Sequence, residues 1–444
     1  MKKDAQKLKA QFEEQRRRFY ASFQRNEGKI LDDRFAREDD EPLTDKEIRE
    51  IDKYWGKYSF AYPQIDYKSF QTYKNRFGEF DVRHCPGNVE YGFFFKAWEK
   101  TPWAIPFQNK AMLPILYSNV HQPRTLVRRM KDILYNEDYQ PISVHEAEDI
   151  LLDFLREDKS HGIICKPNGR NGGHGIEFLR QENANRQNVR AVIAAMGERA
   201  FVAQELMRQS PAMARFNPSS VNTVRMTSLV WYGKVHILSA IVRIGASGST
   251  VDNFCSGGSL LGMDPKTGVL NHWAMDQNKG KITVLPSGVD LSQKLSVPNY
   301  QGVVEAVKSM HYRVPYIRMI AWDIALDEND TPTLIECNFA GYYQMSEFNS
   351  GAIFKEHLDG MLDQWLVKLF SLPLATDSFV CDEYAKHIVI REYIGESTNV
   401  EIPKEINGKP VTGIDKNAFK GYQIETVSAP VKLLAQAQKA AGLA

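Results

Sequence analysis

Apolar residues recur at helical spacing in two parts of the first half of the chain. Residues 1–60 are highly charged, and their sparse apolar positions fit one stripe of a helix. Thr44 with Glu47 fits a capping box, in which the two residues satisfy each other's free backbone amides. Ser143 with Glu146 repeats this pattern, and apolar residues follow at every third or fourth position. We therefore predict helices that begin at Thr44 and at Ser143.

After residue 160 the apolar positions form the short runs that are typical of strands. Residues 161–167 and 201–207 each make one such run. Two hairpins and a closing helix are predicted further on, over residues 221–244, 319–336 and 353–370. Earlier in the chain, residues 61–105 are dense in Tyr, Phe and Trp, which is more typical of a core than of a ligand groove.

Composition narrows the class of protein. With 444 residues, the chain is long enough for two or three domains. Its 56 basic and 55 acidic residues give a net charge of +1, which offers no electrostatic case for a nucleic-acid or membrane partner. No apolar run approaches the roughly 18–20 residues of a membrane span. The five scattered cysteines form no CxxC pair, so we expect reduced thiols in a cytoplasmic protein without a zinc site.

A glycine-rich loop follows the first predicted strand. Residues 166–175 read Lys-Pro-Asn-Gly-Arg-Asn-Gly-Gly-His-Gly. Glycines let successive backbone amides point at one anion, and Lys166 adds a positive charge at the end of the strand. The order of a P-loop is absent. Phosphate binding is one interpretation of this loop, and an ordinary hairpin tip is the other.

Oxygen-bearing side chains converge on the second predicted hairpin. If its turn is centred between Asn329 and Asp330, Asp323 lies opposite Glu336. Asn338 shares the face of Glu336, because side chains alternate along a strand. Carboxylates that face each other repel unless a cation lies between them, and Mg²⁺ fits that need. The alternative is that nearby arginines satisfy both acids.

Two arginines lie within the apolar strands of the first predicted hairpin. An unpaired charge would be costly at Arg225 or Arg243, and a guanidinium can hold carboxylate or phosphate oxygens with two hydrogen bonds. A polar, glycine-rich loop over residues 252–258 follows. The alternative for each arginine is a structural salt bridge.

In this order, the motifs resemble the ATP-grasp superfamily, and within it the sugar-transfer-associated ATP-grasp domain related to alpha-L-glutamate ligases. The resemblance covers about residues 105–370 and rests on Lys166-Pro167, Gly172-Gly173-His174-Gly175, Gln204-Glu205, residues 222–225, Arg243-Ile244-Gly245, residues 252–258, Trp322-Asp323 and Glu336-Cys337-Asn338. It implies an α+β ATP-grasp fold in which two lobes grip ATP. The implied division is a helical, aromatic-rich N-terminal region (1–104), an ATP-grasp domain (105–375, with lobes at about 120–205 and 206–375), a small β-rich module (380–431) and a tail (432–444).

The resemblance also assigns roles to single residues. Lys166 would touch the α- and β-phosphates, beneath a loop that includes Asn171, Gly172, Gly173, His174 and Gly175. A hinge would read the adenine, formed by Gln204, Glu205, Leu206 and Met207. The candidates for a second nucleotide-binding basic group are Lys110 and Arg129, the latter beside Arg128 and Lys131.

For the chemistry itself, the resemblance implies two magnesium ions held by Asp323, Glu336 and Asn338. Arg225 and Arg243 would steady the γ-phosphate or the substrate carboxylate. Contacts to the substrate are implied for Asn222, Asp252, Asn253, Gly257 and Gly258.

The expected function is that of a magnesium- and ATP-dependent, ADP-forming carboxylate ligase. It would form an acyl-phosphate and join a small-molecule carboxylate to an amine or similar nucleophile, in polysaccharide or peptide-like metabolite synthesis. An ATP-grasp kinase and a non-catalytic ATP-binding protein are the alternatives, and homo-oligomerisation stays open. Residues 400–419 resemble a single unit of the BspA-type leucine-rich repeat, to which we assign no chemistry.

Overall fold

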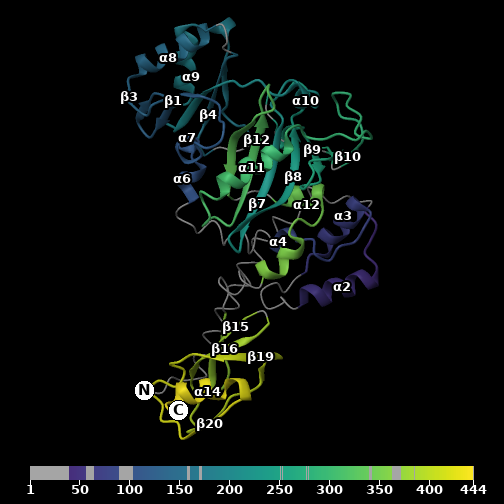
Figure 1. Cartoon of the computed structure of the whole chain (residues 1–444), viewed down its shortest axis with the longest axis vertical. Helices are drawn as coiled ribbons and strands as arrows, with labels where there is room; N and C mark the ends of the chain where they lie inside the picture. The colour runs from purple at the N-terminus through teal and green to yellow at the C-terminus, as the bar shows by residue number, and fades with distance from the viewer. Residues whose placement is uncertain are drawn as a thin grey trace. The chain divides into compact units, whose positions relative to one another are not determined.

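The computed structural model divides into two compact units (Figure 1), which comprise residues 98–353 and residues 1–97 with 354–444. The predicted helical stripe in residues 1–39 and most of the aromatic-rich stretch lie outside the described residues. The structure describes residues 40–56, 65–89, 104–157, 161–169, 173–250, 252, 254–276, 278, 280–339, 343–362, 372–384 and 386–443. No helix in these ranges combines the length and the apolar character needed to cross a membrane.

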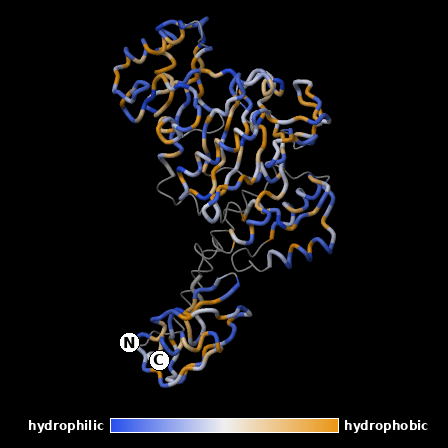
Figure 2. The backbone as a smooth tube through the Cα atoms, in the orientation of Figure 1, coloured by the Kyte–Doolittle hydropathy of each residue, from blue (hydrophilic) through white to orange (hydrophobic). Residues whose placement is uncertain are grey.

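The first sheet of the 98–353 unit has six antiparallel strands in the order β3-β2-β1-β6-β4-β5. Helices α8 (Val144–Arg156) and α9 (Arg186–Ala195) pack against it around an apolar core. Hydrophobic and hydrophilic residues alternate along both helices, as Figure 2 shows. The predicted capping box at Ser143 is confirmed. The strands are β1 (Thr125–Met130), β2 (Ile133–Tyr135), β3 (Pro141–Ile142), β4 (Ile163–Pro167), β5 (Glu177–Leu179) and β6 (Phe201–Glu205).

The second sheet of this unit has seven antiparallel strands in the order β11-β10-β9-β8-β7-β12-β13. Helix α11 (Tyr300–His311) packs on one face, and α12 (Gln344–Ser350) contacts β8 and β9. The strands are β7 (Thr223–Trp231), β8 (Lys234–Ile244), β9 (Ser259–Met263), β10 (Leu270–Met275), β11 (Lys281–Ile282), β12 (Met319–Leu326) and β13 (Pro332–Asn338).

The two faces of the second sheet differ in character. Val224 and Met226 belong to the apolar core with α11, so the alternating residue Arg225 points to the opposite face. Helix α12 lies against that opposite face at β9, since a Cβ atom at Gly262 would lie 1.8 Å from Asn349 O. A glycine is therefore required where α12 meets the sheet.

The first predicted hairpin is confirmed, with β7 and β8 joined by a two-residue turn. Tyr232 and Gly233 both have positive φ, at 47° and 75°. Two successive positive φ values are typical of the type I′ turn, whose twist matches that of the flanking strands.

The second predicted hairpin pairs Asp323 with Glu336, as expected, but for a different reason. The pairs next to the turn, such as Ile324 with Leu334, correspond to a turn centred on Asn329 itself. The register then shifts, which leaves Ile335 as an extra residue in a β-bulge. The expected turn centre was therefore wrong by half a residue, and the bulge restores the expected pair.

Short helices connect the two sheets and run alongside them. Phe107, Leu113 and Tyr117 pack into the core of the second sheet, so the segment before β1 is anchored there. These helical segments are α6 (Ala104–Gln108), α7 (Leu113–Leu116), η3 (Gln181–Asn183), α10 (Pro211–Ala214) and η4 (Phe254–Ser256).

The other unit contains helices α2 (Asp45–Trp55), α3 (Tyr67–Phe77) and α4 (Gly87–Val89). The predicted capping box at Thr44 is confirmed. Of the expected closing helix, the structure describes η5 (Lys355–His357) and helical backbone at 358–362. The C-terminal strands share one apolar core with α14 (Val431–Ala441) and are β14 (Leu372–Ala375), β15 (Phe379–Glu383), β16 (Ile388–Tyr393), β17 (Asn399–Glu401), β18 (Glu405–Ile406), β19 (Lys409–Ile414) and β20 (Thr426–Ser428).

Candidate nucleotide-binding site

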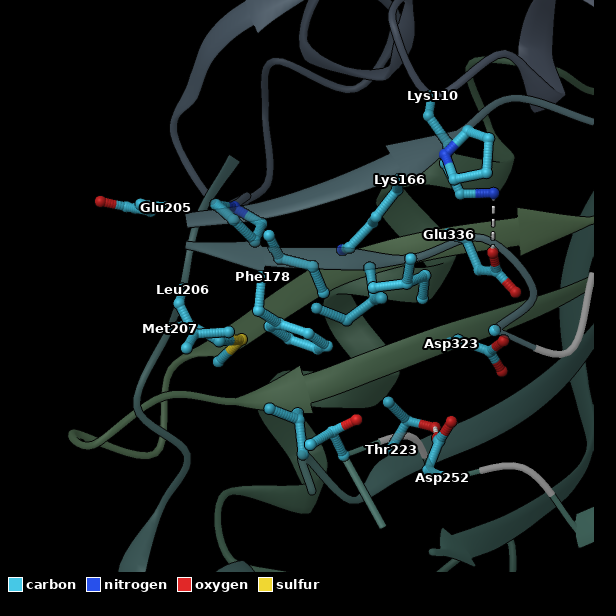
Figure 3. A pocket seen from close by; sticks show the side chains of 18 of the residues that line it. Lys110, Lys166, Phe178, Glu205, Leu206, Met207, Thr223, Asp252, Asp323 and Glu336 are labelled. Atoms are coloured by element: carbon cyan, nitrogen blue, oxygen red, sulfur yellow. Dashed lines mark hydrogen bonds and ion pairs between the residues drawn. The ribbon is translucent and has the colours of Figure 1, made fainter. Parts of the chain in front are cut away.

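A pocket in the 98–353 unit is lined by residues from both sheets (Figure 3). The first sheet contributes β4, β5 and the end of β6, and the second contributes β7, β8, β12 and β13. The lining side chains divide into an apolar group and a charged group. The pocket is lined by Lys110, Pro123, Ile164, Lys166, Pro167, Gly173, His174, Ile176, Phe178, Glu205, Leu206, Met207, Val221, Thr223, Arg243, Thr250, Asp252, Asp323, Ile335 and Glu336.

The apolar part of the pocket lies beside the end of β6. Ile164 on β4 pairs with Phe178 on β5, and Met207 follows β6 (Figure 3). The backbone here is held tightly, because Leu206 N donates a hydrogen bond of 2.9 Å to Gly162 O. Gly162 has φ of 115°, and a Cβ atom there would lie 2.5 Å from Leu179 O. The result is a flat apolar slot beside a fixed stretch of backbone, which suits a planar aromatic base.

Only part of the predicted hinge faces this slot. Glu205, Leu206 and Met207 line the pocket. The Gln204 side chain is buried on the other face of β6, where Nε2 donates to Thr125 Oγ1 at 3.0 Å. Its side chain therefore does not reach the pocket, as the alternation of side chains along a strand requires. The Glu205 carboxylate accepts a hydrogen bond from Arg124 N and, in Figure 3, points away from the other labelled side chains.

Two lysines stand over the charged part of the pocket. Lys166 is only 9% exposed, and among the described residues its amine has no hydrogen-bond or ion-pair partner. Burial, with a smaller contribution from Lys110, lowers the pKa of Lys166 to about 8. Lys110 Nζ lies 3.1 Å from Glu336 Oε2 (Figure 3). A buried amine without a counter-ion favours an anionic ligand at this position.

The Asp323 carboxylate, 1% exposed, is held by both strand arginines. Arg225 Nε donates to Oδ1 at 2.8 Å, and Arg225 Nη2 donates to Oδ2 at 2.7 Å. Arg243 Nη1 donates to Oδ2 at 2.9 Å. Arg225 does not line the pocket, so it acts on the site through Asp323, whereas Arg243 reaches the pocket itself. The structural salt bridge thus forms at both arginines.

Glu336 is more accessible, with its side chain 31% exposed. Burial opposes its ionisation, but the charges of Lys110, Arg243 and Arg225 outweigh burial and lower the pKa of Glu336 to about 2. Asn338 Nδ2 donates weakly to both acids, at 3.3 Å to Asp323 Oδ2 and 3.4 Å to Glu336 Oε1. The carboxylate of Glu336 is therefore ionised and close to the pocket's lysines.

These acids fit a hard cation that brings further ligands with it. In the described ranges, no group of three His, Cys, Asp or Glu residues could by itself hold a metal ion. Asp323 Oδ1 and Glu336 Oε1 each accept one hydrogen bond, so each retains a free lone pair. Rotation of the Asn338 amide would add a third oxygen. Mg²⁺ bound by one or two carboxylates plus phosphate oxygens matches this donor set.

Asp252 and Thr223 form the floor of the pocket beside Arg243. Thr223 Oγ1 donates to Asp252 Oδ2, and Arg243 Nη2 lies 3.4 Å from Asp252 Oδ1. Within the described structure, Arg243 Nε is buried without a hydrogen-bond partner. Of the predicted substrate residues, Asp252 therefore lines the pocket, while Asn253 lies outside the described residues and Gly257 and Gly258 do not line it.

Three other predicted contacts are placed elsewhere or not described. Arg129 points away from the pocket, because Nη1 donates to Gly197 O and the guanidinium lies over the Phe201 ring. Lys110 lines the pocket instead. Asn222 is fully buried beside the pocket, where Nδ2 donates to three oxygens of the preceding loop. Asn171 and Gly172 lie outside the described residues, whereas Gly173 and His174 line the pocket.

Several lining residues were missed by sequence reasoning, although strand alternation could have found some of them. Ile164 lies two positions before Lys166 on β4, and Thr223 lies two positions before Arg225 on β7. Each shares a face with a residue that the motifs singled out. Phe178 on β5 could not be found in this way, since its partner strand was not predicted.

The chain is similar to three solved structures, and no curated protein matches it. These are the biotin carboxylase domain dimer of Hydrogenobacter thermophilus 2-oxoglutarate carboxylase, with magnesium ADP and bicarbonate, an L-amino acid ligase from Bacillus licheniformis, and the VanG D-Ala:D-Ser ligase from Enterococcus faecalis. Their identities to this chain are 14%, 13% and 10%, with TM-scores of 0.31, 0.32 and 0.34. The matches cover 53%, 57% and 58% of this chain, and only 41%, 48% and 62% of the other chains.

A family model described as sugar-transfer associated ATP-grasp matches residues 131–359. The matched range contains Lys166, Asp323 and Glu336, and it covers slightly more than half of the 444 residues. The match and the two antiparallel sheets with their helices confirm the predicted α+β ATP-grasp fold. The chain therefore belongs to the sugar-transfer-associated ATP-grasp family.

Proposed function

We propose that this protein is a magnesium- and ATP-dependent carboxylate ligase that releases ADP and phosphate. The observation that carries the proposal is the meeting of Lys110, Lys166, Asp323 and Glu336 around one pocket with an apolar slot at its side. Cations for a polyphosphate, acids for a divalent ion and a slot for a base together suit a magnesium–nucleoside triphosphate complex.

The pocket's own residues suggest how ATP lies in it. The adenine would enter the slot formed by Ile164, Phe178 and Met207, next to the backbone of residues 205–207. The phosphates would then extend toward Lys166, whose buried amine gains a counter-ion. Gly173 and His174, from the glycine-rich loop, would cover them. This assignment keeps the proposed nucleotide-binding roles of Lys110 and Lys166 and drops that of Arg129.

Magnesium would be held by Glu336, Asp323 and Asn338, as their free oxygens allow. When bound, it would neutralise charge that develops on the transferring phosphoryl group. Arg243, which reaches the pocket and retains a buried, unpartnered Nε within the described structure, would face the γ-phosphate or the substrate carboxylate. Arg225 would hold Asp323 and Arg243 in place through the Asp323 carboxylate.

The proposed chemistry needs no serine or cysteine nucleophile. An oxygen of the substrate carboxylate attacks the γ-phosphorus of ATP, the bond to the β-phosphate oxygen breaks, and ADP leaves. An amine or similar nucleophile then attacks the acyl carbon, and inorganic phosphate leaves with the bonding electron pair. The residues described here would orient these groups and stabilise the negative charge.

Product analysis tests the proposal directly. The full chain is incubated with Mg²⁺, ATP, candidate carboxylates and amines, and the products are separated and weighed by mass spectrometry. We expect one ADP and one phosphate for each new amide or related bond, and no turnover in Lys166→Met. Phosphate retained on the product would show a kinase. Failure of the wild-type protein to bind magnesium ADP would show that the pocket is not a nucleotide site.

We further propose that residues 380–431 form a partial leucine-rich-repeat-like module. Parallel pairing of β17 with β20, 27 residues apart in sequence, supports this proposal, since stacked repeats align their strands in parallel. The apolar core of this segment includes Val400, Ile402 and Phe419 from the resembling motif. The domain boundaries expected from the sequence likewise stay proposals.

A further inference from the structure

The loop that carries Lys110 is fastened to the base of the glycine-rich loop by one side chain. Asn168 Oδ1 accepts a hydrogen bond of 3.2 Å from Lys110 N, and Asn168 Nδ2 donates at 2.8 Å to Asn109 Oδ1. Asn168 is itself fixed, because its backbone N donates at 2.8 Å to Ala200 O. One asparagine therefore ties two consecutive residues of a distant segment to the end of β4.

A second contact holds the same segment from the other side. Tyr139 Oη donates at 2.8 Å to Ala111 O, and its ring lies against the Arg128 guanidinium at 3.7 Å. Within the segment, Ala111 N donates at 3.0 Å to Asn109 Oδ1. The backbone on both sides of Lys110 is thus defined by hydrogen bonds to the first sheet and its turns, while Phe107 and Leu113 anchor the flanking helices in the core of the second sheet.

Asn168 also lies two residues after Lys166, on the same stretch of chain. It does not line the pocket, whereas both lysines do. We propose that Asn168 is a positioning residue that sets the location of the Lys110 amine relative to Lys166, and so determines how tightly the phosphates of a nucleotide are held. The proposal rests on the proposed function of the pocket as a nucleotide site.

The physical effect expected of Asn168 is pre-organisation. Without its side chain, the Lys110 N–H and the Asn109 carbonyl lose their partners, and the loop samples positions in which the Lys110 amine is displaced. Two hydrogen bonds of ordinary strength correspond to roughly a tenfold loss of affinity for a ligand that contacts the Lys110 amine. A ligand without phosphates should lose nothing, because its contacts lie at the apolar slot.

The experiment measures dissociation constants of adenosine and of magnesium ADP by calorimetry for the full-length wild type, Asn168→Ala, Lys110→Met and the double variant. We expect Asn168→Ala to weaken ADP binding about tenfold and to leave adenosine binding unchanged. In the Lys110→Met background, Asn168→Ala should have no further effect, because it acts through that lysine. Asn185→Ala is the matched control, since it removes the cap of α9 in the same lobe but touches no pocket residue.

Each contrary result has a distinct meaning. Equal losses for adenosine and ADP, or additive losses in the double variant, would overturn the positioning role. Unchanged ADP affinity in a folded Asn168→Ala protein would do the same. A melting temperature for Asn168→Ala below that of Asn185→Ala, together with loss of both ligands, would indicate a structural role. A wild type that binds neither ligand would instead overturn the proposed nucleotide site.

Discussion

At the scale of single residues, the two acids of the second hairpin differ more than their shared motif suggests. Asp323 is buried and receives three hydrogen bonds from two arginines, whereas Glu336 is partly exposed and faces one lysine. Removal of Asp323 would leave two buried guanidinium groups without their carboxylate. Removal of the Glu336 charge would leave one lysine that can reach solvent.

We therefore expect Glu336→Gln and Asp323→Asn to fail in different ways. Glu336→Gln should abolish magnesium-dependent tightening of ADP binding with little change in melting temperature. Asp323→Asn should lower the free energy of unfolding by roughly 3–5 kcal/mol, because it breaks a buried ion-pair network. Chemical denaturation and calorimetric titration of ADP with and without Mg²⁺ would measure both effects. Equal loss of stability in the two variants would contradict this assignment.

Lys166 should make nucleotide binding depend on pH. Burial lowers its pKa to about 8, and binding of phosphates requires the protonated amine. The affinity for ADP should therefore be full below about pH 8 and decrease above it, while the affinity for adenosine stays constant. Lys166→Arg keeps its charge at these pH values, so its ADP affinity should not change with pH. Calorimetric titrations between pH 7 and pH 9.5 provide the measurement, and a pH-independent wild type would contradict the role.

The sequence carried these residues only as far as their chemistry. It marked Asp323, Glu336 and both arginines as unusual in apolar strands, and it left open whether the arginines serve a ligand or the acids. That choice depends on cross-strand neighbours: Asp323 pairs with Arg225 because β12 lies beside β7, an adjacency that spans almost one hundred residues of sequence. No local pattern encodes such a pairing.

At the scale of elements, a buried chain of hydrogen bonds fastens α11 to the second sheet. Trp322 Nε1 donates to Ser228 Oγ at 2.8 Å, and Ser228 lies 2.7 Å from His311 Nδ1. His311 Nε2 lies 2.8 Å from Ile317 O, so Nε2 carries the proton and Nδ1 accepts from Ser228. The neutral imidazole satisfies all of these groups. Trp322 immediately precedes Asp323, so this network also fixes the back of the candidate site.

Acid should weaken this network before it affects the acids of the pocket. Burial lowers the pKa of His311 to about 4, although its hydrogen bond to Ile317 O opposes the shift. The unfolded chain binds the proton near pH 6.5, so the free energy of unfolding should fall as pH decreases from 6.5 toward 4, by about 3 kcal/mol. His311→Gln should be less stable at pH 7 and lose less stability over this range. Urea denaturation at several pH values measures the difference, and equal slopes would contradict it.

Elements with a local signal were predicted well, and those without one were not. The capping boxes at Thr44 and Ser143 and the hairpin at Tyr232-Gly233 depend on residues close in sequence, and all three are confirmed. The short strands β2, β3, β5 and β9 to β11 carry too few residues for an alternating pattern to stand out. The bulge at Ile335 has no sequence signal that we could identify.

At the scale of the whole molecule, the apolar cores are separate. The two cores of the 98–353 unit draw their residues from 113–339, and the C-terminal core draws its residues from 379–437. Every residue that lines the pocket lies between Lys110 and Glu336. The fold class was predictable because the motifs occur in a fixed order, whereas the identity of the acceptor was not, because function depends on the details of a site.

Removal of the C-terminal module should therefore spare the nucleotide site. A chain that ends after residue 375 should bind magnesium ADP with an affinity within about twofold of the full chain, because none of the pocket's contacts is removed. Calorimetry on the two proteins at equal concentration is the measurement. A truncated protein that folds but no longer binds ADP would show that the module contributes to the site.

The bulge on β13 allows something that a regular strand forbids. Adjacent residues of an ordinary strand face opposite ways, yet Ile335 and Glu336 both line the pocket. A greasy surface and an ionised oxygen are thereby placed next to each other, at the boundary between the base and the phosphates. Loss of a single residue here would turn the acid over into the oily layer beneath the sheet, so this strand tolerates substitution far more readily than a change of length.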